Sequence, residues 1–170
     1  MNCIHNIRNL LLMSAVCSVM GSHAATQAVD MEVSAIVLAS CTLRATKLNF
    51  GIVVPWEKKN AGAVVTATCT SGTTYALDVG NGEQSTTTGG AGTQFRRQMV
   101  SGANFLPYVL YQEAERVTEI GVSGNDNFLK NGVGNGEEQH KTIYGSVIGA
   151  EIKNNPAGEY FDKVVITITF

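Results

Sequence analysis

His140 is the one histidine beyond residue 24, and any catalytic triad in the chain would need it as the base. It lies in Glu137-Glu138-Gln139-His140-Lys141, a charged segment that precedes an expected strand. The simplest interpretation of this position is a solvated loop. Asp162, beside Tyr160, is interpreted as a turn or sheet hydrogen-bonding residue. We therefore predict no catalytic residues and no enzyme.

Two other segments contain residues that could bind an ion or a cofactor. Asn125-Asp126-Asn127, with Glu137 and Glu138, offers the oxygen ligands that calcium prefers, but the spacing matches no known calcium loop. Gly132-x-Gly134-x-Gly136 lacks the strand–turn–helix setting of a nucleotide loop. Both segments are typical of polar loops, and we expect no metal and no cofactor.

The first 24 residues resemble a secretory signal peptide. His5 and Arg8 form a weakly basic start, residues 10–20 are apolar but too short to span a bilayer, and Ser22-His23-Ala24 is a small-x-small cleavage site. The alternative is a buried N-terminal helix or a membrane anchor.

Removal of this leader takes away Cys3 and Cys17 and leaves Cys41 and Cys69. An even pair in an exported chain predicts a disulfide. The alternative is a pair of free or metal-bound thiols, although a zinc site would need more ligands than the chain offers.

Charge and length narrow the class of protein. The 170 residues carry 12 Lys and Arg against 14 Asp and Glu, for a net charge of −2. Lys58-Lys59 and Arg96-Arg97 are pairs too small to form the positive stripe that a phosphate backbone requires, so we expect no nucleic-acid partner. One domain is expected at this length.

Short runs rich in Val, Ile, Thr, Tyr and Phe alternate with Gly, Asn and Ser, which predicts an all-β sandwich. Strands are expected over 25–43, 48–51, 63–70, 75–79, 95–100, 106–113, 142–147 and 163–170, with loops over 80–94 and 128–138. The strands 63–70 and 75–79 are expected to form a hairpin. Pro107 predicts an edge position or a bulge.

Both ends of the exported chain are strand-like. The sequence stops at Phe170 within an alternating pattern, and the N-terminal segment alternates without a turn signal that would fold it back. Because terminal segments usually fray unless they are tied down, these ends suggest strand pairing between molecules.

The chain contains several short motifs that are informative when they are taken together. They are Cys41, Phe50-Gly51, Cys69-Thr70-Ser71-Gly72-Thr73-Thr74-Tyr75, Arg97-Gln98-Met99, Leu106-Pro107-Tyr108-Val109-Leu110-Tyr111, Tyr144-Gly145, and Gly158-Glu159-Tyr160-Phe161-Asp162 before Val165-Ile166-Thr167-Ile168-Thr169-Phe170. In this order and spacing the chain resembles the spore coat U family, the secreted pilin subunits of archaic chaperone–usher pili. One departure is Ile120-Gly121, where such proteins commonly carry Trp-Gly; the substitution keeps an apolar residue for burial.

The resemblance implies an incomplete immunoglobulin-like β-sandwich that lacks its last strand and has an N-terminal donor-strand extension. It implies a shaft or adaptor pilin, assembled by donor-strand complementation, that supports adhesion and biofilm formation at the cell surface. The implied partners are neighbouring pilin subunits, a periplasmic chaperone and an outer-membrane usher. The expected division is 1–24 signal peptide, 25–40 donor extension and 41–170 pilin domain.

The donor strand is expected to present every second residue to the groove of a neighbouring subunit. The expected donor residues are Val29, Met31, Val33 and Ala35, and the expected chaperone-facing residues of the C-terminal strand are Val164, Ile166, Ile168 and Phe170. The alternative for residues 29–35 is an ordinary first strand of the chain's own sheet. Alternative functions are a secreted spore-coat or matrix protein of the same fold and, more distantly, a carbohydrate-binding module or a hydrolase.

Overall fold

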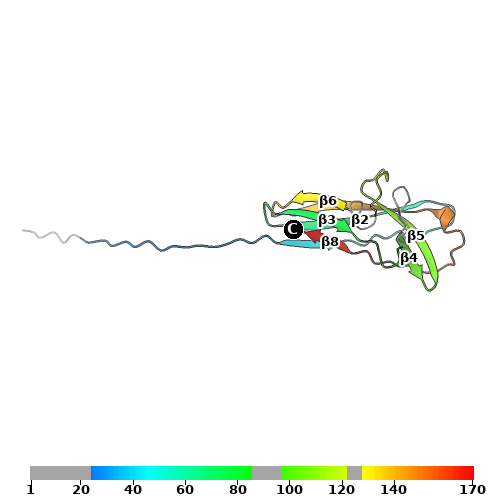
Figure 1. Cartoon of the computed structure of the whole chain (residues 1–170), viewed down its shortest axis with the longest axis horizontal. Helices are drawn as coiled ribbons and strands as arrows, with labels where there is room; N and C mark the ends of the chain where they lie inside the picture. The colour runs from blue at the N-terminus through cyan, green and yellow to red at the C-terminus, as the bar shows by residue number, and fades with distance from the viewer. Residues whose placement is uncertain (1–23, 86–96, 122–127) are drawn as a thin grey trace, which may run out of the picture. The chain divides into compact units, whose positions relative to one another are not determined.

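The computed structural model describes residues 24–85, 97–121 and 128–170, so residues 1–23 of the expected leader lie outside the described part (Figure 1). The described strands are β1 (Cys41–Ala45), β2 (Lys59–Cys69), β3 (Thr74–Val79), β4 (Arg97–Ser101), β5 (Asn104–Tyr111), β6 (Phe128–Val133), β7 (Glu138–Val147) and β8 (Ile166–Thr169), with a 3-10 turn, η1, at Gly149–Glu151. The chain divides into two units, Met1–Ile36 and Val37–Phe170.

The second unit is a sandwich of two antiparallel sheets. A five-stranded sheet has the order β1-β2-β7-β5-β4, and a three-stranded sheet has the order β6-β3-β8 (Figure 1). Every second residue of β2 from Ala63 onward and of β3 is buried, as the period-2 pattern predicts, and Val65, Ala67, Leu77 and Val79 belong to one core. The all-β sandwich prediction is therefore confirmed.

The prediction that 63–70 and 75–79 form a hairpin is wrong. β2 and β3 belong to different sheets, and the turn between them crosses from one sheet to the other. Gly72 has a φ of 82° there, a conformation that favours glycine. A tight turn between two alternating runs is typical of both a hairpin and a sheet-to-sheet corner, so local sequence does not separate them.

The expected boundaries differ at three other places. The strand expected over 25–43 is found only from Cys41, as β1, and residues 48–51 form no strand although one was expected there. The loop expected over 128–138 contains β6, which pairs with β3. Gly132 lies on that strand where an added Cβ would collide with the ring of Tyr75, so its glycine reflects close packing and not a loop.

Pro107 lies where the sheet tolerates a missing N–H group. It is opposite Gln98 of β4, while β5 pairs with β7 only from Val109 to Tyr111. At Pro107 the strand therefore has one ladder neighbour, so the expected edge position holds locally, although β5 as a whole lies between β7 and β4.

Candidate functional site

Each sheet has an edge strand on the same side of the sandwich, β1 in the five-stranded sheet and β8 in the three-stranded sheet. In the described part of the chain β1 pairs only with β2, and β8 pairs only with β3. Residues of β1 and β8 also approach each other, so these two edges border one region of the surface (Figure 1). We call this region the β1/β8 edge.

The backbone of each strand directs alternate polar groups toward this edge. Ser40 O accepts from Thr70 N, and Thr46 N donates to Val64 O, so the even-numbered residues of β1 bond to β2. Gly80 N donates to Val165 O, so the odd-numbered residues of β8 bond to β3. Because antiparallel ladders alternate, the N–H and C=O groups of residues such as Leu43 and Ile168 point to the β1/β8 edge, where another strand could pair with them.

Apolar side chains accompany these backbone groups. Val164, Ile166 and Ile168 are half-buried and pack against the core, as do Cys41 and Leu43 of β1. Half-buried apolar residues beside an unpaired ladder are the surface that an added strand would cover.

The side chains of Val164, Ile166 and Ile168 point inward, but the side chain of Phe170 does not. Its side chain is 56% exposed, because β8 ends at Thr169 and nothing in the described chain covers the position after it. The inward alternation of the C-terminal strand therefore ends before Phe170.

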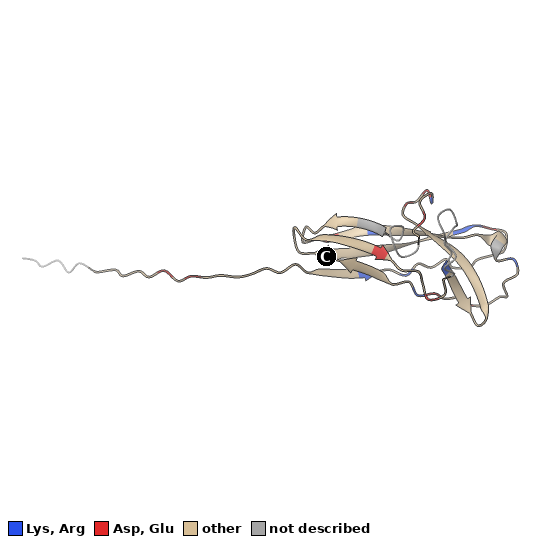
Figure 2. Cartoon of the chain, viewed as in Figure 1, with Lys and Arg blue, Asp and Glu red and all other residues tan. Residues whose placement is uncertain are grey.

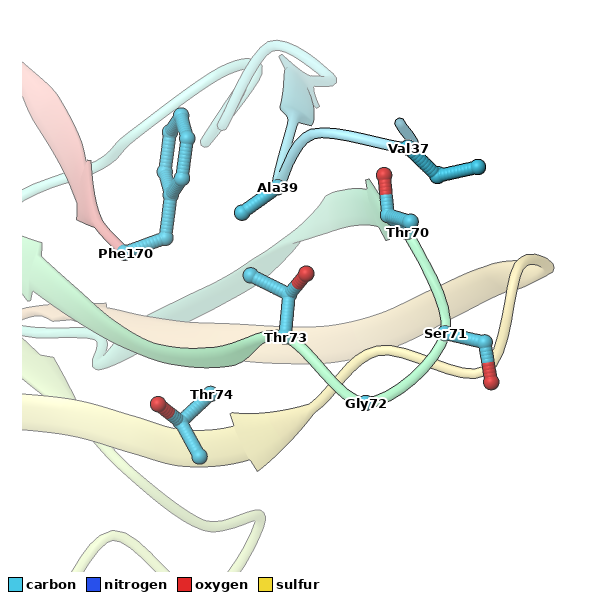
Figure 3. Close-up of a pocket in the computed structure, with 8 residues that line it drawn as sticks. All are labelled: Val37, Ala39, Thr70, Ser71, Gly72, Thr73, Thr74 and Phe170. Carbon is cyan, nitrogen blue, oxygen red and sulfur yellow. The ribbon is translucent and has the colours of Figure 1, made fainter. Parts of the chain in front are cut away.

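Phe170 instead lines an open pocket at one end of the sandwich. The pocket has a volume of about 470 Å³ and is lined by Val37, Ala39, Thr70, Ser71, Gly72, Thr73, Thr74 and Phe170. Figure 3 shows the side chains of Phe170, Ala39 and Thr73 approaching the same space from three segments. We call it the end pocket.

A disulfide joins β1 to β2 next to this pocket. Cys41 and Cys69 face each other in the β1–β2 register, with a Cα–Cα distance of 4.1 Å, and form the bond that the cysteine pair predicts. Cys69 is buried and Cys41 is half-buried. The bond fixes the edge strand to the body of the sheet.

A buried polar cluster holds the segment before β8. The fully buried Arg97 donates hydrogen bonds to the carbonyl oxygens of Ile120 and Gly121, at 2.7 and 3.0 Å, and of Gly80, at 3.0 Å. Arg97 is thus an interior residue that binds carbonyl groups, and not part of an exposed basic pair. Burial lowers the pKa of the Arg97 guanidinium to about 10, against the charges of Tyr108, Asp162 and Glu119.

Asp162 connects this cluster to the C-terminal strand. Its carboxylate accepts hydrogen bonds from the Tyr108 hydroxyl at 2.5 Å and from the N–H groups of Glu83 and Lys163 at 2.9 and 2.8 Å. Burial, and then the hydrogen bond to Asp162, raises the pKa of the Tyr108 hydroxyl above its ordinary value. Asp162 is thus a structural hydrogen-bonding residue, as the sequence indicated, in the segment that leads into β8.

The expected donor residues lie in the other unit. Residues 24–36 form neither helix nor strand, and Val29, Met31 and Val33 are exposed to 93%, 82% and 83%. Ala35 is exposed as well. These residues make no strand of the chain's own sheets, so the alternative of an ordinary first strand finds no support in the described structure.

The remaining candidates for chemistry are dispersed. His140 lies within β7 and not in a loop, exposed and 3.0 Å from the Thr66 hydroxyl. Asn125-Asp126-Asn127 lies outside the described residues.

Among the described residues no three His, Cys, Asp or Glu side chains gather at a possible metal site, and no helix has the length and apolarity to cross a membrane. Figure 2 shows the Lys and Arg positions scattered over separate elements.

Comparisons with known proteins were made for sequence and for structure. No curated protein is significantly similar to the chain in sequence. A solved structure with 23% identity and a TM-score of 0.44 is the chaperone–tip adhesion subunit pre-assembly complex CsuC-CsuE from archaic chaperone–usher Csu pili of Acinetobacter baumannii; the match covers 79% of this chain. This chain spans 40% of that one, well under two thirds of its length.

The family comparison covers most of the sequence. Residues 27–167 match the Spore Coat Protein U domain, a range that includes every described strand except the last two residues of β8. The chain belongs to the Spore Coat Protein U domain family.

Proposed function

We propose that the protein is a structural subunit, a shaft or adaptor pilin, of an archaic chaperone–usher pilus. The observation that carries the proposal is the β1/β8 edge, where two unpaired strand edges and half-buried apolar side chains lie together. An edge of this kind is an aggregation hazard in a free chain, and an added strand would satisfy both its hydrogen bonds and its apolar surface.

Residues 29–35 of a second copy would supply that strand. Val29, Met31, Val33 and Ala35 lie on one face of an extended chain, whereas Asp30, Glu32 and Ser34 lie on the other. The apolar face would cover the core side of the β1/β8 edge, and the polar face would remain in solvent. Chaperone–pilin donor-strand complementation is a known form of such β-augmentation.

Before assembly, a periplasmic chaperone would occupy the same edge. Val164, Ile166, Ile168 and Phe170 form the strip that it would contact, and the half-exposed Phe170 suits a partner better than it suits the chain's own core. An outer-membrane usher would then exchange the chaperone for the donor strand.

The proposed route places the subunit at the cell surface. Residues 1–24 would direct export and be removed, residues 25–40 would form the donor extension, and residues 41–170 the pilin domain. The Cys41–Cys69 bond supports an oxidising compartment along this route. The proposed role in the assembled pilus is adhesion and biofilm formation, without catalysis.

Expression with and without a chaperone tests this function. The chain exported alone to the periplasm is expected to aggregate or be degraded, because its edge stays open. Co-export with the chaperone of an archaic pilus system is expected to give a soluble one-to-one complex. A monodisperse monomer that unfolds cooperatively without a partner would contradict the proposal and favour the secreted coat or matrix protein.

A further inference from the structure

Loop 51–58 exposes apolar side chains without a cover in the described structure. Ile52 is 85% exposed, Trp56 71% and Val54 42%. We call residues 51–58 the tryptophan loop. Three exposed apolar residues on one short loop are typical of an interaction surface and not of a solvated turn.

Specific contacts fix the conformation of the tryptophan loop. Trp56 has a φ of 75°, which is rare for a bulky residue and costs free energy unless the surroundings impose it. The Lys153 ammonium lies 5.6 Å from the centre of the indole ring. Gly149 packs so closely on the backbone of Glu57 that no Cβ would fit between them. These contacts hold the indole in a defined outward position.

The tryptophan loop and the end pocket lie at opposite ends of the sandwich. The loop precedes Lys59, the first residue of β2, and the end pocket begins at Thr70, just after the last. Eleven residues of strand separate the two sites, a length of about 33 Å. A contact between them therefore joins two copies head to tail, the kind of contact that can repeat from copy to copy along a filament.

We propose that Trp56 of one subunit docks into the end pocket of the next subunit in the fibre. The inference rests on the proposed function and adds a second, non-strand contact to each junction. The pocket volume of about 470 Å³ accommodates an indole, and Phe170 and Val37 offer the ring an aromatic and an aliphatic wall.

The short connection between donor strand and pocket brings the two surfaces together. Ala35, the last expected donor residue, is two residues from Val37, which lines the pocket, and two extended residues span at most about 7 Å. A donor strand that leaves the neighbouring subunit must therefore emerge close to this subunit's end pocket.

The direction of the donor strand decides which end of the neighbour is met. β8 runs toward the end pocket, since Phe170 lines it. β1 runs away from the end pocket and β8 runs toward it, so a donor between them is antiparallel to one and parallel to the other. A donor antiparallel to β8 would run away from the neighbour's pocket and emerge at the opposite end, where the tryptophan loop lies. A donor parallel to β8 would emerge at the neighbour's own end pocket, from which that neighbour's extension also starts, so two connections would compete for one place.

Charge favours the same pairing. Glu57, Lys58 and Lys59 follow Trp56 and Lys153 lies over its ring, so this loop carries more positive than negative charge. Glu137 and Glu138 stand at the start of β7 beside the end pocket, where Glu138 forms an ion pair with Arg44. Gly136 N donates to Cys69 O, which places this acidic turn next to residues 70–74. A basic loop and an acidic pocket rim attract each other across the junction.

The fluorescence of Trp56 tests the inference directly, because the chain contains one tryptophan. Fibres are assembled in vitro from the chaperone-bound chain alone, and the released chaperone is washed away. We expect a blue-shifted emission and a severalfold smaller acrylamide quenching constant than in the unfolded chain. Fibres whose Trp56 remains freely quenched would overturn the inference and leave the proposed function intact, whereas a failure of this chain alone to form fibres contradicts the shaft role within the proposed function.

A pocket variant shows where the indole is buried. Ala39→Arg places bulk and positive charge in the end pocket at an exposed position outside the strands, and fibres of this variant are expected to lose most of the protection of Trp56. Val117→Arg, an equally large change at a side chain that is 79% exposed and outside both sites, is expected to leave the protection unchanged. Full protection in Ala39→Arg fibres would reject the end pocket as the binding site. If Ala39→Arg chains do not assemble, the quenching of wild-type fibres still decides whether Trp56 is buried at the junction.

Discussion

The hydroxyl of Tyr108 on β5 lies 2.5 Å from the carboxylate of Asp162, so a side chain of the five-stranded sheet holds the segment that leads into β8 of the other sheet. Asp162 also accepts from two backbone N–H groups. This carboxylate thereby ties the segment before β8 to the core, together with the mutual backbone hydrogen bonds of Val100 and Phe161.

Tyr108→Phe is expected to destabilise the chaperone-bound subunit by about 1.5–3 kcal/mol, the usual contribution of a hydrogen bond to a charged group. The measurement is thermal or urea unfolding of the wild-type and variant complexes, in which the chaperone's own contribution cancels. A variant as stable as the wild type would show that the bond contributes nothing to folding.

The same pair predicts a pH dependence. The pKa of Tyr108 is raised in the folded state, so the folded chain keeps a proton that the unfolded chain loses above about pH 10. The stabilisation by the hydroxyl should be constant below pH 10 and decline as the pH rises further. The lowered pKa of Arg97, about 10, makes the stability rise with pH instead. Arg97 is present in both the wild type and Tyr108→Phe, so its contribution cancels from the difference between them. The stability difference between wild type and Tyr108→Phe should therefore shrink only at alkaline pH.

Replacement of both bridging cysteines by alanine is expected to cost about 3–4 kcal/mol in the chain-entropy account of a loop with a sequence separation of 28. The yield of secreted subunit should fall, and unfolding of the chaperone complex should shift to lower denaturant concentration. A reducing agent should shift the wild type to the same midpoint and leave the double variant unchanged.

A charge on the apolar face of the donor extension is expected to prevent assembly. Met31→Asp would bury a carboxylate in the neighbour's core, whereas the chaperone complex should form normally because the donor face is unused at that stage. Glu32→Gln, on the opposite face, is the matched control and should assemble like the wild type. Loss of the chaperone complex in Met31→Asp would instead assign the segment to the subunit's own fold.

Gly134→Ala is expected to disrupt the corner between β6 and β7. A Cβ at this position would meet the Thr70 carbonyl oxygen and the Cys69 side chain at 2.5 and 2.7 Å, both of which are fixed by the adjoining strand. Gly62→Ala is the control, since its Cβ would find only ordinary contacts beyond 3.5 Å. The yield of soluble chaperone complex should fall for the first variant and not for the second.

The period-2 pattern in the sequence was sufficient to predict the sandwich and the buried faces of β2 and β3, and the even pair of cysteines left after leader removal predicted the disulfide. It could not show that β2 and β3 lie in different sheets, because a corner and a hairpin share the same turn residues. It also failed at β6, where three glycines suggested a loop. The burial of Arg97 was hidden for a different reason: its partners are carbonyl groups of residues 79–80 and 120–121, which only the tertiary fold brings together.

The position of the disulfide has a mechanical consequence. A pull on residues 24–36 reaches the sandwich through residues 37–40 and then Cys41, at the end of β1, where the bond to Cys69 begins. Without that bond the load would fall on the first ladder hydrogen bonds and peel β1 from β2 one pair at a time. With it, tension passes covalently to the longest strand of the larger sheet, so a stretched fibre should reach its breaking force elsewhere than at β1.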